Sequence, residues 1–193
     1  MVDELPFTPN EDANRLLAAE PFAVMVGMLL DQQVPMEWAF QAPALLKERL
    51  GGTLDEGAVA AMPVEDVEVV FRAKPALHRF PGSMAKRTHA LAQFLVERYG
   101  GKAENVWLDA ATGDELLARV KELPGFGNDK ARIFVGLLGK RLDVRPPGWE
   151  QAAADWASIA DVDSYDRVME IRQQKRAVKA AKRAAQQPPE PPR

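Results

Sequence analysis

The segment Phe22–Asp31 places the strongest constraint on how this chain folds. It is apolar on nearly every face of a helix and ends only where Asp31 interrupts it. A helix with no polar side is typical of the centre of a hydrophobic core, because any exposed side would leave apolar surface in water. The run is also shorter than the roughly 18 apolar residues that a membrane span requires. The sequence therefore predicts a helix buried on all sides, and no membrane span.

Helical periodicity dominates the rest of the chain, and no convincing strand-like alternation occurs. Further helices are expected at Glu11–Glu20, at Met36–Leu50, in a segment opened by Pro63, and at Ser83–Tyr99. Pro and Gly residues stand at the expected helix ends. Val67–Phe71 is rich in β-branched residues, but the acids inside it disfavour a strand. Helices joined by short loops, with no strands, predict an all-α fold.

Composition excludes several kinds of site. The 193 residues include no cysteine, which excludes disulfides, a thiolate nucleophile, cysteine-bound zinc and an iron–sulfur cluster. His78 and His89 are the only two histidines, so a histidine-rich metal site is not expected. Met1–Asn10 carries two acids and no basic stretch of the kind that opens a signal peptide. We expect a cytoplasmic monomer with no metal and no organic cofactor.

Charge is unevenly distributed along the chain. The net charge is −3, yet the stretch from Ile171 to Gln187 contains six basic residues and no acid. These basic residues are Arg172, Lys175, Arg176, Lys179, Lys182 and Arg183. The tail 171–193 ends in a Pro-rich run and is expected to be disordered. Its charges indicate either a nucleic-acid-binding arm, which we favour, or a solvated helix end.

Two helices joined by a tight turn are expected between Thr112 and Lys140. Thr112 and Glu115 have capping-box spacing, which starts the first helix. Pro124-Gly125-Phe126-Gly127 ends it, and Asn128 is suited to cap the next helix, Asp129–Lys140. The two glycines allow close backbone approach to a partner, and the following helix N-terminus offers unpaired N–H groups to a phosphate. An ordinary turn between packed helices is equally compatible with this spacing.

The sequence around this turn resembles a known motif. Leu123–Ala131 reads Leu-Pro-Gly-Phe-Gly-Asn-Asp-Lys-Ala and resembles the hairpin of the helix–hairpin–helix DNA glycosylases, the relatives of endonuclease III, adenine glycosylase and 3-methyladenine glycosylase. Leu29–Val34 resembles the end of that family's central helix, and Lys86-Arg87 resembles part of the helix before its hairpin. The three segments occur in the family's order, and the resemblance covers roughly Phe22 to Asp143.

The resemblance implies a two-lobe all-α fold without an iron–sulfur cluster. The helical barrel lobe would span residues 21–125, and residues 1–20 with 126–170 would form the second lobe. The partner implied is duplex DNA, whose phosphate the hairpin backbone grips, with a monovalent cation held by hairpin carbonyls. The DNA-binding residues so implied are Gly125, Phe126, Gly127, Asn128, Lys130, Gln32 and Gln33. The two glutamines would wedge into the duplex; alternatively, they are ordinary polar residues at a helix end.

The chain departs from the family at its catalytic positions. Where some members carry a nucleophilic lysine, this chain has Asp129, and Lys130 follows one residue later. One step along a helix turns a side chain by about 100°, so Lys130 is not expected to be that nucleophile. The family's carboxylate position corresponds to Pro147–Trp149, which contains no acid.

Two nearby acids are the candidates for the catalytic role. Cleavage of an N-glycosidic bond develops positive charge on the sugar, which a carboxylate stabilises. Glu150 is the first candidate and Asp143 the second; both could equally be surface acids. The resemblance therefore implies a base-excision repair protein, a DNA N-glycosylase without lyase activity. The alternative is a DNA-binding relative that has lost catalysis. Alanine at both Gly125 and Gly127 is expected to weaken duplex binding while the helices persist.

Overall fold

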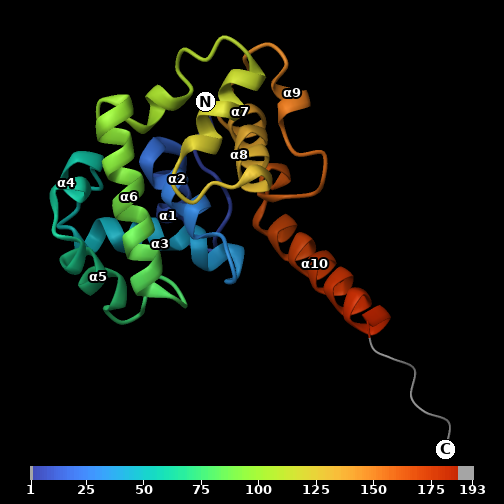
Figure 1. Cartoon of the computed structure of the whole chain (residues 1–193). Coiled ribbons are helices and arrows are strands. Elements are labelled where there is room, and N and C mark those ends of the chain that lie inside the picture. The colour runs from blue at the N-terminus through green and yellow to red at the C-terminus, as the bar shows by residue number, and fades with distance from the viewer. Residues whose placement is uncertain (1, 187–193) are drawn as a thin grey trace, which may run out of the picture.

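The computed structural model describes residues 2–186, whose regular elements are all helices, with no strand among them. The α-helices are α1 (Glu11–Ala19), α2 (Pro21–Leu30), α3 (Met36–Arg49), α4 (Glu56–Ala61), α5 (Val64–Arg72), α6 (Pro81–Tyr99), α7 (Gly113–Glu122), α8 (Asn128–Arg141), α9 (Trp149–Ala152) and α10 (Tyr165–Gln186). Two 3₁₀ turns, η1 (Ala103–Val106) and η2 (Ile159–Asp161), connect them (Figure 1). The predicted all-α class is confirmed.

Helix α2 lies at the centre of the core, as its composition predicts. Every residue from Phe22 to Leu30 is buried, and α1, α3, α6 and η1 pack around it. The approach of α3 is close enough that a Cβ on Gly27 would lie 2.7 Å from the Phe40 ring. Within residues 2–186, no single helix has the length and apolar character to cross a membrane. The α1–α2 pair meets that criterion only when joined, across a bend of 114°.

Besides α1, α2 and α3, which pack on one another, two further groups of helices belong to the same hydrophobic cluster. Helices α4 and α5 pack on α6, while α7, α8 and α9 pack on one another and η2 packs on α8. The main contacts of α1, which the sequence assigned with the rest of residues 1–20 to the second lobe, are with α2 and α3. Helix α1 packs there because its apolar residues join the core: Leu17 and the preceding Leu5 and Phe7 are buried in the same cluster as α2.

The C-terminal segment differs from the expected disordered tail. Residues 171–186 form the greater part of α10, which extends away from the body in Figure 1. The start of α10 is fixed to the body because Val168 and Ile171 are buried in the core and Arg172 forms an ion pair with Glu37 of α3. Where the sequence predicted a disordered tail, the structure describes 171–186 as helix. The Pro-rich end, 187–193, lies outside the described residues.

Local capping follows the sequence in most places. Thr112 Oγ1 accepts a hydrogen bond from the Glu115 N–H at 3.1 Å, as the capping-box spacing predicts. Asn128, however, does not cap α8: Gly127 occupies the N-cap position and offers no side-chain bond. The side chain of Asn128 instead approaches Asp129 Oδ1 at 3.4 Å. The helix begins one residue earlier than predicted because Gly127 already has the extended backbone of an N-cap.

Candidate nucleic-acid interface

The turn between α7 and α8 is exposed at its glycines and anchored by its aromatic residue. Gly125 adopts a left-handed conformation with φ +86°, and the Phe126 N–H closes the turn on the Leu123 carbonyl at 3.0 Å. The Phe126 ring is buried and meets Phe134 of α8 edge-on, with centroids 5.6 Å apart. Gly127, Asn128 and Asp129 are exposed. The backbone of the turn therefore faces outward on an apolar anchor.

Lys130 joins this hairpin to the end of the central helix. Its ammonium group donates to the carbonyl oxygens of Met28 at 2.6 Å, Leu29 at 2.9 Å and Asp31 at 3.4 Å. These carbonyls belong to the C-terminal end of α2, where the helix dipole favours a cation. Burial lowers the pKa of Lys130 to about 8, while the negative charge of Asp31 opposes that shift. The contact fixes α8 against α2 and accounts for Lys130 pointing inward.

The two glutamines after α2 have different surroundings. Gln32 is tied down: its Nε2 donates to the Leu29 carbonyl at 2.8 Å, and its Oε1 accepts from Arg87 at 3.0 Å. His78 fixes the Gln32 backbone, since its Nδ1 accepts from the Phe80 N–H, which leaves Nε2 to donate to the Gln32 carbonyl at 3.0 Å. Gln33 is exposed, with φ +58°. Of the two, Gln33 is therefore better placed to enter a duplex, and Gln32 holds the turn.

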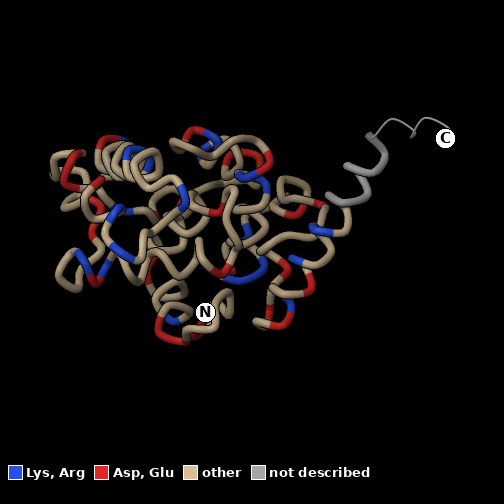
Figure 2. The backbone as a smooth tube through the Cα atoms, turned by 90° about the horizontal axis from the view of Figure 1, so that it is seen from below, with Lys and Arg blue, Asp and Glu red and all other residues tan. Residues whose placement is uncertain are grey.

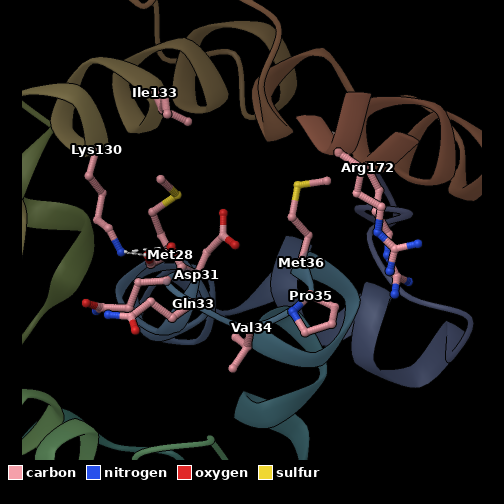
Figure 3. Close-up of a pocket in the computed structure, with 11 residues that line it drawn as sticks. Met28, Asp31, Gln33, Val34, Pro35, Met36, Lys130, Ile133 and Arg172 are labelled. Atoms are coloured by element: carbon pink, nitrogen blue, oxygen red, sulfur yellow. Dashed lines mark hydrogen bonds between the residues drawn. The ribbon is translucent and has the colours of Figure 1, made fainter. Parts of the chain in front are cut away.

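A pocket of about 520 Å³ opens where α2, α8 and α10 meet. Its apolar lining comes mainly from α2, α8 and the residues after α2, and its polar groups come from Asp31, both glutamines and three cations. The lining residues are Met28, Asp31, Gln32, Gln33, Val34, Pro35, Met36, Lys130, Ile133, Arg172 and Arg176. Figure 3 shows Lys130 and Arg172 at opposite sides of this space, with Asp31 and Met36 between them. The hairpin, the glutamine turn and the basic helix thus share one site.

The two predicted catalytic acids are not part of this pocket. Glu150 lies exposed on the short helix α9, which packs on α7 and α8. Asp143 is also exposed, has φ +60°, and pairs with Arg145 at 3.3 Å. The loop between them is fixed against α7, because the Gly113 N–H donates to the Pro147 carbonyl at 2.8 Å. Neither acid is brought together with the predicted DNA-binding residues at the pocket.

The hairpin glycines differ in what a side chain would meet. A Cβ on Gly125 would lie 2.4 Å from Leu29 Cδ1, and its positive φ disfavours any L side chain. A Cβ on Gly127 would meet nothing within 4 Å. The double alanine substitution considered above would therefore disturb the α2–hairpin packing. Gly127→Ala alone tests the outward face of the turn.

The structure adds site residues that the sequence analysis did not select. These are Asp31 and Met36, together with Arg172 and Arg176, which the sequence indicated only as part of a basic DNA-binding arm and not as pocket residues. The one available signal for the arginines was their spacing of four residues, which places them on one face of a helix, but the tail was expected to be disordered. Asp31 directly precedes the glutamines and was treated only as the end of α2. Among residues 2–186, no group of three or more His, Asp or Glu could hold a metal ion.

Comparison with known proteins finds no relative of this chain. No protein-family model, characterised protein or solved structure matches this chain. The likeness to the glycosylase hairpin consequently stays an interpretation of three short segments. The structure connects two pairs of them through side chains, since Arg87 bonds Gln32 and Lys130 bonds the carbonyls at the end of α2.

Proposed function

We propose that this protein binds duplex DNA through the 123–131 hairpin and removes a damaged base by hydrolysing its N-glycosidic bond. The observation that carries the proposal is the position of the hairpin. Its exposed turn leads into Lys130, which joins the start of α8 to the end of α2, so the first turn of α8 and the glutamine turn border one pocket. A pocket beside a duplex-binding edge is what an enzyme acting on an extruded base requires.

The hairpin supports phosphate binding through its backbone. Within α8, the Ala131 N–H is the first to bond back, to the Gly127 carbonyl at 2.9 Å. The preceding N–H groups of the first turn have no acceptor inside the helix and point toward its N-terminal end. That end also carries the positive pole of the helix dipole. An exposed turn with these groups suits a phosphate oxygen.

The charge distribution over the rest of the protein favours a few local contacts with DNA rather than binding by a broad basic surface. Figure 2 shows Lys and Arg interspersed with Asp and Glu along the helical body. The exception is α10, whose sequence from Ile171 onward is basic. Because Arg172 and Arg176 also line the pocket, this helix extends the site outward along the path that a neighbouring DNA backbone would take. DNA affinity is therefore expected to depend strongly on salt.

Gly127→Ala is expected to weaken duplex binding while the fold is retained. The added methyl group enters open space in the free protein, but it would occupy the position from which a phosphate approaches the turn. Loss of about one charge-assisted hydrogen bond corresponds to roughly a tenfold to hundredfold increase in Kd. Fluorescence anisotropy with a labelled duplex measures the change, and thermal melting checks the fold.

Gly57→Ala is the matched control for that measurement. Gly57 is an exposed glycine on α4, a helix that packs on α6. The same substitution there should leave duplex affinity unchanged. Equal affinities for wild type and a folded Gly127→Ala variant would remove the hairpin from the interface.

Neutralising the outer part of α10 is expected to reduce the salt dependence of DNA binding. The variant replaces Lys179, Lys182 and Arg183 by glutamine and keeps the full chain, including buried Ile171 and the Arg172–Glu37 pair. Three lost phosphate contacts would lower the slope of log K against log salt by up to about 3. Any preference for damaged DNA should persist. A slope equal to that of the wild type would show that α10 does not contact the backbone.

Catalysis is tested with duplexes that carry a panel of base lesions. A glycosylase without lyase activity leaves abasic sites that break only after alkali, whereas a lyase breaks the strand without it. Wild-type protein is expected to give alkali-dependent breaks. Duplex binding with no excision from any lesion would favour the second candidate, a non-catalytic DNA-binding protein. The observation that supports this candidate is the lack of an acid at Pro147–Trp149.

A further inference from the structure

The pocket contains one carboxylate, and its position matters for the proposed chemistry. Asp31 ends α2, where its N–H bonds the Gly27 carbonyl at 3.0 Å. Figure 3 shows its side chain directed from the end of α2 into the space beneath α8, between Lys130 and Met36. Asp31 is half-buried, unlike the exposed Glu150 and Asp143. It is thus the acid that a ligand in this pocket would meet.

We propose that Asp31 faces the sugar of a nucleotide bound in this pocket and stabilises the positive charge that develops when the glycosidic bond breaks. The inference rests on the proposed function and names the residue that supplies the carboxylate. Sequence reasoning assigned that role to Glu150 or Asp143, which lie outside the pocket. Asp31 would supply the same charge from the end of α2 rather than from the loop after α8.

The charges around the pocket fit a ligand with two kinds of group. Arg176 would attract phosphate directly. Arg172, which pairs with Glu37, and Lys130, which is bonded to carbonyls, add positive charge nearby. A carboxylate among these cations weakens binding of a simple anion, because like charges repel. The carboxylate favours binding only of a ligand that has anionic groups at its ends and a centre that becomes cationic. A nucleotide losing its base has this pattern, with phosphates on both sides of a sugar cation.

The apolar lining fits the rest of such a ligand. Met28, Met36 and Ile133 are among the lining residues, and methionine sulfur packs well on aromatic rings. The exposed amide of Gln33 also lines the pocket and is able to bond the polar rim of a base, while the Gln32 amide stays bonded to Leu29 and Arg87. The ligand class is therefore a nucleotide whose base rests on methionine and whose sugar lies near Asp31.

The reaction balances with water as the only co-reactant. The C1′–N bond breaks and its electron pair stays on the base nitrogen, so an alkylated cationic base leaves as a neutral molecule. The sugar becomes an oxocarbenium ion opposite the Asp31 carboxylate. Water then forms a bond to C1′ and gives one proton to the carboxylate, which releases it to solvent. The products are the free base and an abasic sugar with a hydroxyl group at C1′.

The test compares two abasic duplexes of the same sequence by equilibrium binding. One carries a neutral tetrahydrofuran nucleotide, and the other carries a pyrrolidine nucleotide, whose protonated nitrogen resembles the sugar cation. Wild-type protein should bind the pyrrolidine duplex more tightly by about tenfold or more, on the order of one close ion pair. Asp31→Asn keeps the size of the side chain and should abolish most of that preference, while its affinity for the tetrahydrofuran duplex is retained.

Three variants serve as controls. Asp129→Asn removes an exposed acid from the hairpin and should keep the pyrrolidine preference, which separates a specific contact from a general change in charge. Glu150→Gln and Asp143→Asn should also keep it. Loss of the preference in either of these two variants, with Asp31→Asn unaffected, would overturn the assignment.

The outcomes separate this inference from the proposed function. If wild-type protein binds no duplex, the proposed function fails and the role of Asp31 fails with it. If it binds both duplexes equally, DNA binding stands and the role of Asp31 is overturned. Thermal melting of Asp31→Asn confirms that the variant is folded. Persistence of the preference in folded Asp31→Asn would likewise overturn the inference.

Discussion

Phe134→Ala is expected to lower the free energy of unfolding by about 3–5 kcal/mol, the usual cost of removing a buried aromatic side chain. Phe134 has no exposed surface. Its ring meets Trp107 and Phe126 edge-on, with centroid distances of 6.1 Å and 5.6 Å. The substitution leaves a cavity directly beneath the hairpin. Denaturant titration of wild type and variant measures the difference.

Phe80→Ala is the control because Phe80 is 42% exposed. Its effect should stay below about 1 kcal/mol. A double-mutant cycle of Phe126→Ala with Phe134→Ala should show a coupling of about 1 kcal/mol, as expected for an edge-to-face ring pair. A cost below about 1 kcal/mol for Phe134→Ala would contradict its place in the core. Zero coupling would mean that Phe126 does not anchor the hairpin on α8.

The sequence predicts most helices here because periodicity and end signals agree. In α2 the absence of a polar face is enough, and Pro21 and Asp31 mark its ends. Helix α4 was not expected: it is a short element whose sequence, Glu-Gly-Ala-Val-Ala-Ala, contains one large apolar residue. Its stability comes from packing on α6 and from the Asp55 side chain, which accepts from the Ala58 N–H at 2.7 Å. Tertiary contact outweighs propensity in such a segment.

Most of helix α10 was likewise not expected. Its composition is so basic that the sequence favours disorder, and the last residues of the chain are Pro-rich. Two buried residues near its start, Val168 and Ile171, nevertheless fix its direction. Their spacing of three residues is the helical signal, but it is weak beside the charges that follow. Without the direction of α10, the sequence could not show that Arg172 and Arg176 line the pocket.

The site depends on contacts that sequence spacing cannot supply. Lys130 could be named as a hairpin residue, but its three acceptors lie about 100 residues earlier in the chain, in and just after α2. Asp31 becomes a candidate only when α8 and α10 enclose the space beside it. A motif specifies which backbone turn is formed. The packing of other helices around it determines which carboxylate faces a ligand.

The stability contributed by Lys130 should rise with pH between its folded and unfolded pKa values. Burial lowers its folded pKa from 10.5 to about 8. Between these values the unfolded chain holds a proton on Lys130 that the folded protein has released, so alkali favours folding at this site. Below pH 8 both states are protonated, and the folded state carries the full cost of burying the charge. The expected gain from pH 7 to about pH 10.5 is at most about 3 kcal/mol.

The measurement is the unfolding free energy of wild type minus that of Lys130→Met, followed over this pH range. Methionine keeps an unbranched apolar stem and removes the charge, so titrations elsewhere cancel in the difference. Lys121→Met, at an exposed position of α7, measures the background. A difference that grows above pH 8 confirms that burial governs the titration. A difference that shrinks as pH rises would contradict this prediction. It would show that the carbonyls of Met28, Leu29 and Asp31 stabilise the ammonium form more than burial destabilises it. Loss of the proton would then remove the bonds that join the hairpin to α2.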